Sequence, residues 1–211
     1  MTHSLHRRGD DRSLMEDYVV IFMPSKGINL EGAQEKIRKL WDLCSHYDIV
    51  NFGNVTNGNK YNLSLEELKK CQTLVAQVVF KDKGTLTRFL KELKEANLGL
   101  STVVSGLYDE VKACCATLGD KIHTVEHSLG IHGQTQKLPP ENILEVTTMC
   151  GHALVSSNLV KGMAEEVKKG RKTPEAAGDE LARHCACGIF NPYRAAQLLK
   201  KMVSESDRHP R

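Results

Sequence analysis

Two successive strand–helix–strand patterns in the first half of the chain limit its fold more than any other feature. Each pattern places a helix with apolar residues at three- and four-residue spacing between two short apolar runs that are typical of strands. The assigned ranges are strand 17–24, helix 30–47, strand 48–56, strand 73–80, helix 83–98 and strand 99–107. This order predicts a ferredoxin-like βαββαβ sandwich, in which four antiparallel strands carry two helices on one face.

The pattern after Tyr108 changes to helices. A helical pattern up to Gly119 leads into a segment rich in histidine, glycine and proline, which ends at Pro140. Beyond Pro140 we find only helical patterns, and two of them begin with a capping residue followed by proline, at Thr173 and at Asn191. We therefore expect a small all-helical unit at the C-terminal end of an α+β chain.

The predicted organisation divides the chain into segments of different character. They are a flexible arm at 1–16, the ferredoxin-like α+β sandwich at 17–107, a helix with a His/Gly/Pro-rich connector at 108–140, and a helical Cys/His domain at 141–204. One face of a ferredoxin-like sheet is open, and the run TLVAQVVF alternates too weakly to leave that face polar. Either the C-terminal helices or a second subunit must cover it, and we predict a homodimer.

Charge and hydropathy argue against several functional classes. Lys and Arg number 29 against 26 Asp and Glu, the positive charges are interleaved with negative ones, and aromatic residues make up 5% of the chain. These features argue against nucleic-acid binding. No apolar run approaches the roughly 20 residues of a membrane-spanning helix, and the polar N-terminus lacks the apolar segment of a secretory signal. We therefore expect a cytoplasmic protein without a membrane or nucleic-acid partner.

The cysteines need an explanation other than disulfides, because the cytoplasm is reducing. Cys150 lies in TTMCGH, and Cys185 and Cys187 lie in RHCACG, each stretch with a nearby histidine, His152 or His184. We interpret both stretches as entrances to helices. A helix N-terminus carries partial positive charge and lowers the pKa of a nearby thiol, which favours the thiolate that binds metals.

These residues predict a metal site in which Cys150, Cys185 and Cys187 converge on one centre. Three thiolates can hold a [4Fe–4S] cluster and leave one iron open, or they can hold zinc with His152 or His184 as the fourth ligand. The predicted function is a cytosolic metal- or iron–sulfur-binding protein. If a small-molecule substrate reaches an open coordination position, the protein is a redox or lyase-type enzyme.

The same cysteines allow an interpretation without metal, because free cysteine is often a buried core residue. We assign that role to the cysteines within apolar-periodic stretches, Cys44, Cys71 and Cys114, and find no partner for Cys115. For the three clustered cysteines, core packing remains the alternative to a metal site.

Met149 to His152, with the sequence MCGH, resemble the short cysteine motif of the proline racemase family. In that family a thiolate at a helix start moves a proton on the α-carbon of the substrate. The resemblance covers these four residues, and CACG is not that family's second cysteine motif. It implies a metal-free thiol enzyme, racemase- or isomerase-like, with Cys150 as the nucleophile or acid–base group and His152 nearby.

Histidines in the stretch HTVEHSLGIHG are further candidates for the site. His123 and His127 are four residues apart, and His132 follows in a glycine-flanked loop. The spacing is not that of a HExxH zinc motif, and a lone histidine often has a structural hydrogen bond instead. We expect His127 or His132 to line the same cleft as Cys150, as catalytic residues.

A third hypothesis treats the chain as a regulatory module. Ferredoxin-like sandwiches often bind small ligands or pair through their sheets without catalysing a reaction, and this inference rests on analogy between folds. Metal content most directly separates the three hypotheses, since only the first requires a bound metal.

Overall fold

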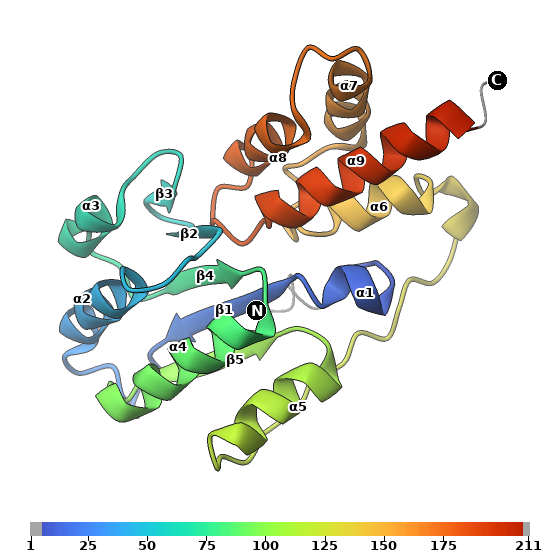
Figure 1. Cartoon of the computed structure of the whole chain (residues 1–211). Coiled ribbons are helices and arrows are strands. Elements are labelled where there is room, and N and C mark those ends of the chain that lie inside the picture. Colours follow the sequence, from blue (N-terminus) through green and yellow to red (C-terminus); the bar gives the residue numbers. More distant parts are fainter. Residues whose placement is uncertain (1–5, 209–211) are drawn as a thin grey trace.

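An antiparallel sheet of five strands forms the centre of the structure (Figure 1). The structure is a computed structural model that describes residues 6–208, so residues 1–5 of the expected arm lie outside the described residues, as do 209–211. The strands follow the order β3-β2-β4-β1-β5, and every neighbouring pair is antiparallel. They are β1 (Tyr18–Met23), β2 (Asn51–Asn54), β3 (Gly58–Asn59), β4 (Ala76–Phe80) and β5 (Ser101–Ser105).

Helices make up the other regular elements, and together with the sheet they confirm the predicted α+β class. The first are α1 (Asp11–Leu14), α2 (Ala33–Cys44), α3 (Leu65–Lys70), α4 (Lys83–Ala96) and α5 (Tyr108–Thr117). After a 3₁₀ turn at Thr135–Lys137 come α6 (Glu141–Thr147), α7 (Ser157–Lys168), α8 (Pro174–Arg183) and α9 (Pro192–Arg208). Within the described part of the chain, no helix has both the length and the apolar character needed to cross a membrane.

Both faces of the sheet are buried, which explains why β1 is apolar throughout and why β4 contains only one polar residue, Gln77. Side chains of Tyr18, Val20 and Phe22 in β1 enter one core, and those of Val19 and Ile21 enter another on the opposite face. The neighbouring strand β4 divides its side chains between the two cores in the same way. This alternation fixes the register, because a slip of one residue would exchange the two faces.

Helices α2 and α4 cover the first face of the sheet (Figure 1). Each is amphipathic: Ile37 and Trp41 of α2 and Leu86 and Phe89 of α4 are fully buried against the strands. Helix α5 packs beside α4 and adds the buried side chain of Cys114 to the same core. The amphipathic patterns that predicted these helices therefore mark the sides that face the sheet.

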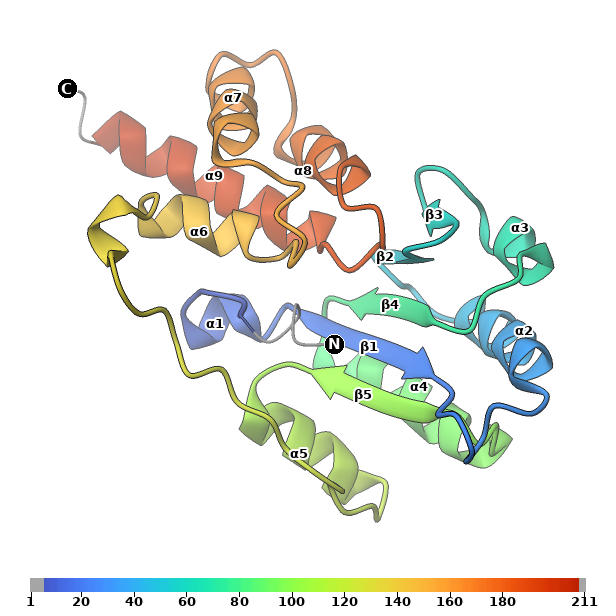
Figure 2. The ribbon, with the colours of Figure 1, turned by 180° about the vertical axis from the view of Figure 1, so that it is seen from behind.

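Helices α6, α8 and α9 lie against the opposite face, near β4 and β1 (Figure 2). Buried side chains of these helices, such as Val146, Leu181 and Leu199, share one core with Val19 and Ile21 of the sheet. The face that we expected to be open is therefore covered by the chain itself. The homodimer remains a prediction. The apolar face of the sheet that motivated it is not exposed, because helices α6, α8 and α9 cover it.

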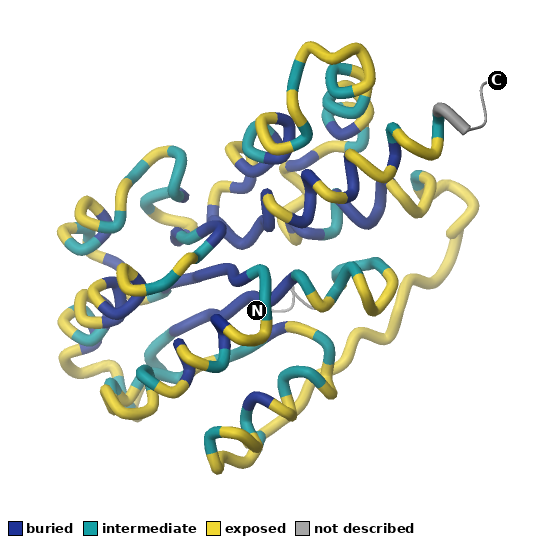
Figure 3. Tube along the Cα trace, viewed as in Figure 1, coloured by how far each residue is buried: buried dark blue, intermediate teal, exposed yellow. Residues whose placement is uncertain are grey.

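The two segments expected to be irregular have different environments. In the described part of the predicted arm, Asp10 caps the short helix α1 by accepting from the N–H of Ser13 at 2.8 Å, and the Arg7 side chain is buried. The connector between α5 and α6, all of it described, contains only the 3₁₀ turn as a regular element and is almost entirely exposed (Figure 3). The proposed domain boundaries remain predictions.

Candidate functional site

Cys150 lies in a turn that follows helix α6 and not at the start of a helix. Its backbone N–H donates to the carbonyl of Thr147 at 3.1 Å, which extends the end of α6. Helix α7 begins only at Ser157, because Ser156 caps it by accepting a backbone N–H of its first turn. Ala153, with a φ of 55°, also interrupts any helix between the two. The prediction that Cys150 opens a helix is therefore wrong.

Cys185 and Cys187 occupy the loop between α8 and α9. Cys185 belongs to the end of α8, since its N–H donates to the carbonyl of Ala182 at 3.0 Å. Helix α9 begins beyond both cysteines, where the Asn191 side chain accepts from the N–H of Arg194 at 2.9 Å. Two of the three cysteines thus lie at helix C-termini, whose partial negative charge disfavours a thiolate.

The three cysteines nevertheless lie together in one buried cluster. Sγ of Cys185 is 3.9 Å from Sγ of Cys187, and the thiol of Cys150 is near enough to Cys185 for the two groups to shift each other's pKa. On the other side, Nδ1 of His152 is 3.7 Å from Sγ of Cys187. All three thiols are buried in the core between the sheet and helices α6, α8 and α9. We refer to Cys150, Cys185, Cys187 and His152 as the cysteine site.

Hydrogen bonds between these thiols set their order of acidity. Donation to Cys185, and then burial, raise the pKa of Cys150 well above its usual range. The interaction with Cys150 lowers the pKa of Cys185. Donation of a hydrogen bond to Cys187 and burial have the opposite effect and are stronger, so the pKa of Cys185 is raised to about 11. The bond from Cys185 lowers the pKa of Cys187. Cys187 is therefore the thiol of this cluster that ionises most readily.

Two asparagines of strands β2 and β3 hold the loop that carries the cysteine pair. Nδ2 of Asn59 donates to the carbonyl of Cys185 at 2.9 Å, and Nδ2 of Asn51 donates to the carbonyl of Phe190 at 2.8 Å. Both side chains are fully buried, so these bonds form away from competing water. We did not predict either residue from the sequence, although asparagine is disfavoured in strands and its presence in one is a signal.

Gly188 lets this loop lie directly against strand β2. Its φ of 77° is in the left-handed region, and a Cβ atom there would lie 2.3 Å from the carbonyl oxygen of Phe52. The glycine that follows the cysteine pair is therefore required both by its backbone conformation and by the contact between loop and sheet.

A cavity of about 340 Å³ opens beside Cys150. Its lining combines hydroxyl groups and a histidine with small apolar groups: His6, Thr147, Thr148, Cys150, Gly151, Ala153, Val155, Ser156 and Ser157. Cys150 is the member of the cysteine site that lines this cavity. A small molecule or ion in the cavity would therefore meet the buried cluster at Cys150.

The other histidines that we singled out have their contacts elsewhere. His184 is exposed, and its Nε2 lies 4.0 Å from a carboxylate oxygen of Glu180. The ring of His127 packs against Tyr108 with their centroids 5.6 Å apart, and Nε2 of His132 is 2.9 Å from a carbonyl of its own loop. None of these three histidines lines the cavity beside Cys150. The structure brings His152 to the thiols and does not bring His184, His127 or His132 there.

The remaining cysteines lie away from the cysteine site. Cys44 and Cys114 are buried in the core beneath α2 and α4, as predicted. Cys71 is only half-buried, and its thiol donates to the carbonyl of Glu67 at 3.3 Å, so the core prediction is wrong for this residue. Cys115 is also half-buried, and burial raises its pKa.

The donor types of the cysteine site suit zinc or iron, but the side chains do not enclose one centre as they stand. Two sulfurs bound at about 2.3 Å to one tetrahedral zinc lie about 3.8 Å apart, close to the 3.9 Å between Cys185 and Cys187. Among residues 6–208, however, no group of three or more histidine, cysteine, aspartate and glutamate side chains is arranged to hold a metal ion. A metal at this site therefore requires at least one side chain to rearrange.

Comparisons with known proteins leave the assignment of function to the geometry. No protein-family model matches this chain, and the searches of curated proteins and of solved structures also find no match. The observations from which a function can be inferred are therefore the buried thiol cluster, the histidine beside it and the cavity that reaches Cys150.

Proposed function

We propose that the cysteine site binds a thiolate-ligated metal centre, either zinc or an iron–sulfur cluster. The observation that carries the proposal for zinc is the chain of short separations from Cys185 Sγ to Cys187 Sγ, 3.9 Å, and from there to His152 Nδ1, 3.7 Å. Ligands of one tetrahedral zinc have edges of about 3.8 Å between sulfurs and about 3.6 Å between sulfur and nitrogen. Rotation of the neighbouring Cys150 side chain toward this edge would supply a third thiolate.

Zinc and an iron–sulfur cluster would use the same residues differently. With zinc, three thiolates and the His152 imidazole complete a Cys₃His set, which is a common structural arrangement. With a [4Fe–4S] cluster, the thiolates leave one iron open. The cavity beside Cys150 supports access by a small molecule to such an open position, and with it the redox or lyase-type reaction that the sequence suggests.

We also propose a finer description of the fold around this site. Without the short strand β3, the order β2-β4-β1-β5 and the two helices on one face agree with a ferredoxin-like βαββαβ sandwich. Helices α6 to α9 would then be a separate helical unit that packs on the other face. A cytoplasmic location, in which free thiols persist, is the compartment that suits this proposal.

A metal-free thiol site is the second candidate, and two observations favour it. The lowered pKa of Cys187 favours its thiolate in the absence of a metal, and the described side chains do not enclose a metal as they stand. In this case Cys187 would be the reactive thiolate, because the raised pKa of Cys150 disfavours the role that the racemase resemblance assigns to it. The non-catalytic regulatory module remains a third hypothesis.

Metal analysis of the full chain tests the main proposal. We expect the anaerobically purified protein to hold zinc in stoichiometric amount, or to be brown with broad absorption near roughly 400 nm if it holds an iron–sulfur cluster. Cys187→Ala should lose the metal, whereas Cys44→Ala, which removes an equally buried thiol from the other core, should keep it. Wild-type protein that takes up neither zinc nor an iron–sulfur cluster on anaerobic reconstitution would rule out the metal centre.

A further inference from the structure

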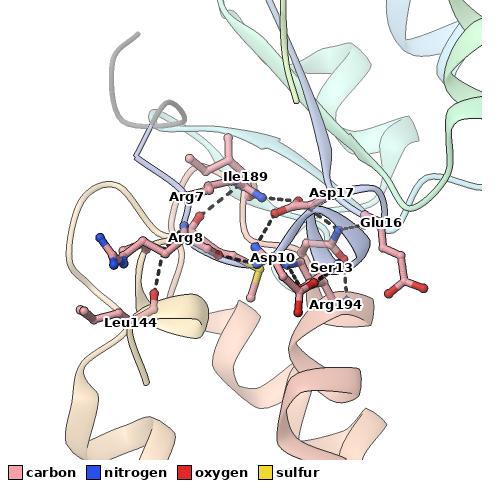
Figure 4. Close-up of polar contacts among 12 residues, drawn as sticks. Arg7, Arg8, Asp10, Ser13, Glu16, Asp17, Leu144, Ile189 and Arg194 are labelled. Atoms are coloured by element: carbon pink, nitrogen blue, oxygen red, sulfur yellow. Dashed lines mark hydrogen bonds and ion pairs between the residues drawn. The ribbon is translucent and has the colours of Figure 1, made fainter. Parts of the chain in front are cut away.

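Arg7, Asp17 and Arg194 form a buried ionic network (Figure 4). The Asp17 carboxylate is fully buried and accepts from two arginines, Arg7 at Oδ1 and Arg194 at Oδ2, the latter at 3.0 Å. Arg194 is fully buried too, and it also donates to Ser13 Oγ at 2.9 Å and to the carbonyl of Arg8 at 2.5 Å. The network therefore joins Arg7 to Asp17, which immediately precedes strand β1, and to Arg194 of helix α9.

Arg7 connects this network to both loops of the cysteine site. Its Nη2 donates to the carbonyl of Met149, at 3.3 Å, and to the carbonyl of Ile189. Met149 immediately precedes Cys150, and Ile189 follows Cys187 and Gly188 in the other loop. The Arg7 side chain is only 6% exposed, so these bonds form in a site that excludes most water. A single guanidinium thus bridges two loops that lie far apart in the chain.

The network also leaves positive charge beside the cysteine site. Arg7 and Arg194 are two buried cations, and Asp17 is the carboxylate that they share. Among the described residues, Nε of Arg7 is buried without a hydrogen-bond partner, so one donor of this cation is unsatisfied. Burial raises the pKa of the nearby Glu145 carboxyl and so disfavours its anion, although Lys201 and Arg194 act in the opposite direction. Burying an uncompensated cation is costly unless a negative group lies nearby.

A metal bound by three thiolates would be such a group. Zinc with three thiolates and a neutral imidazole has a net charge of −1, and so has an oxidised [4Fe–4S]²⁺ cluster with three thiolates. We propose that Arg7 is a positioning residue of the cysteine site, which ties its two loops together and, with Arg194, balances a bound centre that carries one negative charge. The charge balance rests on the proposed metal function, whereas the tie between the loops does not.

Variants of the full chain distinguish the two roles proposed for Arg7, which are to hold the two loops together by hydrogen bonds and to balance the charge of a bound metal centre. Arg7→Met removes both the donors and the charge, and Arg7→Lys keeps the charge with fewer donors. Arg8→Met is the matched control, because the Arg8 side chain is 36% exposed and pairs with Glu141 at the surface. Hydrogen–deuterium exchange of the metal-free proteins reports on the loops, and the rate of zinc release to a chromogenic chelator reports on the bound metal.

In Arg7→Met we expect exchange in 148–152 and in 185–190 to accelerate about tenfold or more, as the loss of bonds from a buried charged donor implies. Zinc release should accelerate by a similar factor, with Arg7→Lys between this variant and wild type. Arg8→Met should change neither rate more than about twofold, as its exposed ion pair implies. If Arg7→Met does not fold, Arg7→Lys is to be judged by the same two rates.

Each outcome bears on a stated part of the proposal. Equal rates of hydrogen–deuterium exchange in the two loops of wild type and of the folded Arg7 variant would show that Arg7 does not hold these loops together. Faster exchange with an unchanged rate of zinc release would disprove the role of Arg7 in balancing the charge of the metal centre. Its role in holding the two loops together would stand. Wild-type protein that binds no zinc and no iron–sulfur cluster would remove the proposed function and the charge balance together, while the exchange rates would still decide whether Arg7 holds the loops.

Discussion

Nδ1 of His152 lies 3.7 Å from Sγ of Cys187, although these residues are 35 positions apart in the chain. The contact joins the turn after α6 to the loop after α8. His184 directly precedes Cys185 in the sequence, yet its side chain points to the surface, where Nε2 is 4.0 Å from Glu180. Of the two histidines that the sequence left as alternatives, the fold thus places His152 beside the thiols and His184 at the surface.

The two histidines should differ in their effect on metal binding. We expect His152→Ala to weaken zinc binding at least about tenfold, because the imidazole is a donor beside the thiolates. His184→Ala is the matched control and should bind zinc as wild type does, since its ring contacts Glu180 and not the thiols. Competition titration with a chelator of known affinity measures both. Equal affinities for the two variants would remove His152 from the site.

Thiol acidity gives a prediction that needs no metal. Since the bond from Cys185 lowers the pKa of Cys187 and donation raises that of Cys150, alkylation of Cys187 should begin at lower pH than alkylation of Cys150. Brief treatment of the metal-free protein with iodoacetamide over a range of pH, followed by peptide mass spectrometry, gives both profiles. Cys185→Ala removes the donor and should move the Cys187 profile to higher pH. A Cys187 profile that does not move would contradict the chain of thiol hydrogen bonds.

Local patterns predicted much of the fold because local forces specify it. The apolar run that became β1 is buried on both faces, and the Thr173–Pro174 pair begins α8 with the expected cap. The start of α7 was predicted too early, because the apolar residues after His152 resemble a helical stripe. Ala153 and Ser156 instead form a turn and a cap, and the Ser156 cap was a signal that we did not use.

The parts of the site that depend on distant segments could not be read from the sequence. Arg7 lies in a polar stretch that is typical of a solvated arm, and its burial requires Asp17, the turn after α6 and the loop before α9 together. Asn59 is the last residue of the stretch NGN, which is typical of a turn, and this pattern hides its role as a donor to the carbonyl of Cys185. A sequence pattern identifies the cysteines, whereas the groups that hold their loops are set by tertiary contacts.

Gly188→Ala should destabilise the protein and disturb the site. The added Cβ would lie 2.3 Å from the carbonyl oxygen of Phe52, and the φ of 77° disfavours alanine as well. Gly170→Ala is the matched control, because its φ of 68° carries the same backbone cost but its Cβ would meet no atom within 4 Å. We expect the control to lose about 1 kcal/mol of unfolding free energy and Gly188→Ala at least about 2 kcal/mol more.

Denaturant unfolding of both variants measures this difference, and zinc release shows whether the cysteine loop has moved. Similar unfolding free energies for the two alanine variants would mean that the loop can leave β2 without cost. The close approach to Phe52 would then not be what positions Cys185 and Cys187.

Glu145→Gln should stabilise the protein at neutral pH. Burial raises the pKa of the Glu145 carboxyl, although Lys201 and Arg194 act in the opposite direction. A carboxyl whose pKa is higher in the folded than in the unfolded protein contributes stability at low pH, and this contribution is lost as the pH rises through the folded value. Glutamine has nearly the shape of the protonated glutamate and is uncharged at every pH. The variant should therefore have a higher unfolding free energy than wild type at neutral pH and the same unfolding free energy below about pH 4.

Urea unfolding at the two pH values tests this expectation, with Glu141→Gln as an exposed control on the same helix. The result also bears on the charge beside the cysteine site. If Glu145→Gln is less stable than wild type at neutral pH, the folded protein uses the Glu145 anion, and Arg194 is a buried cation that favours this anion. In that case the network of Arg7, Asp17 and Arg194 would have no positive charge left over for a bound metal centre, and Arg7 would act on the site only through its bonds to the two loops.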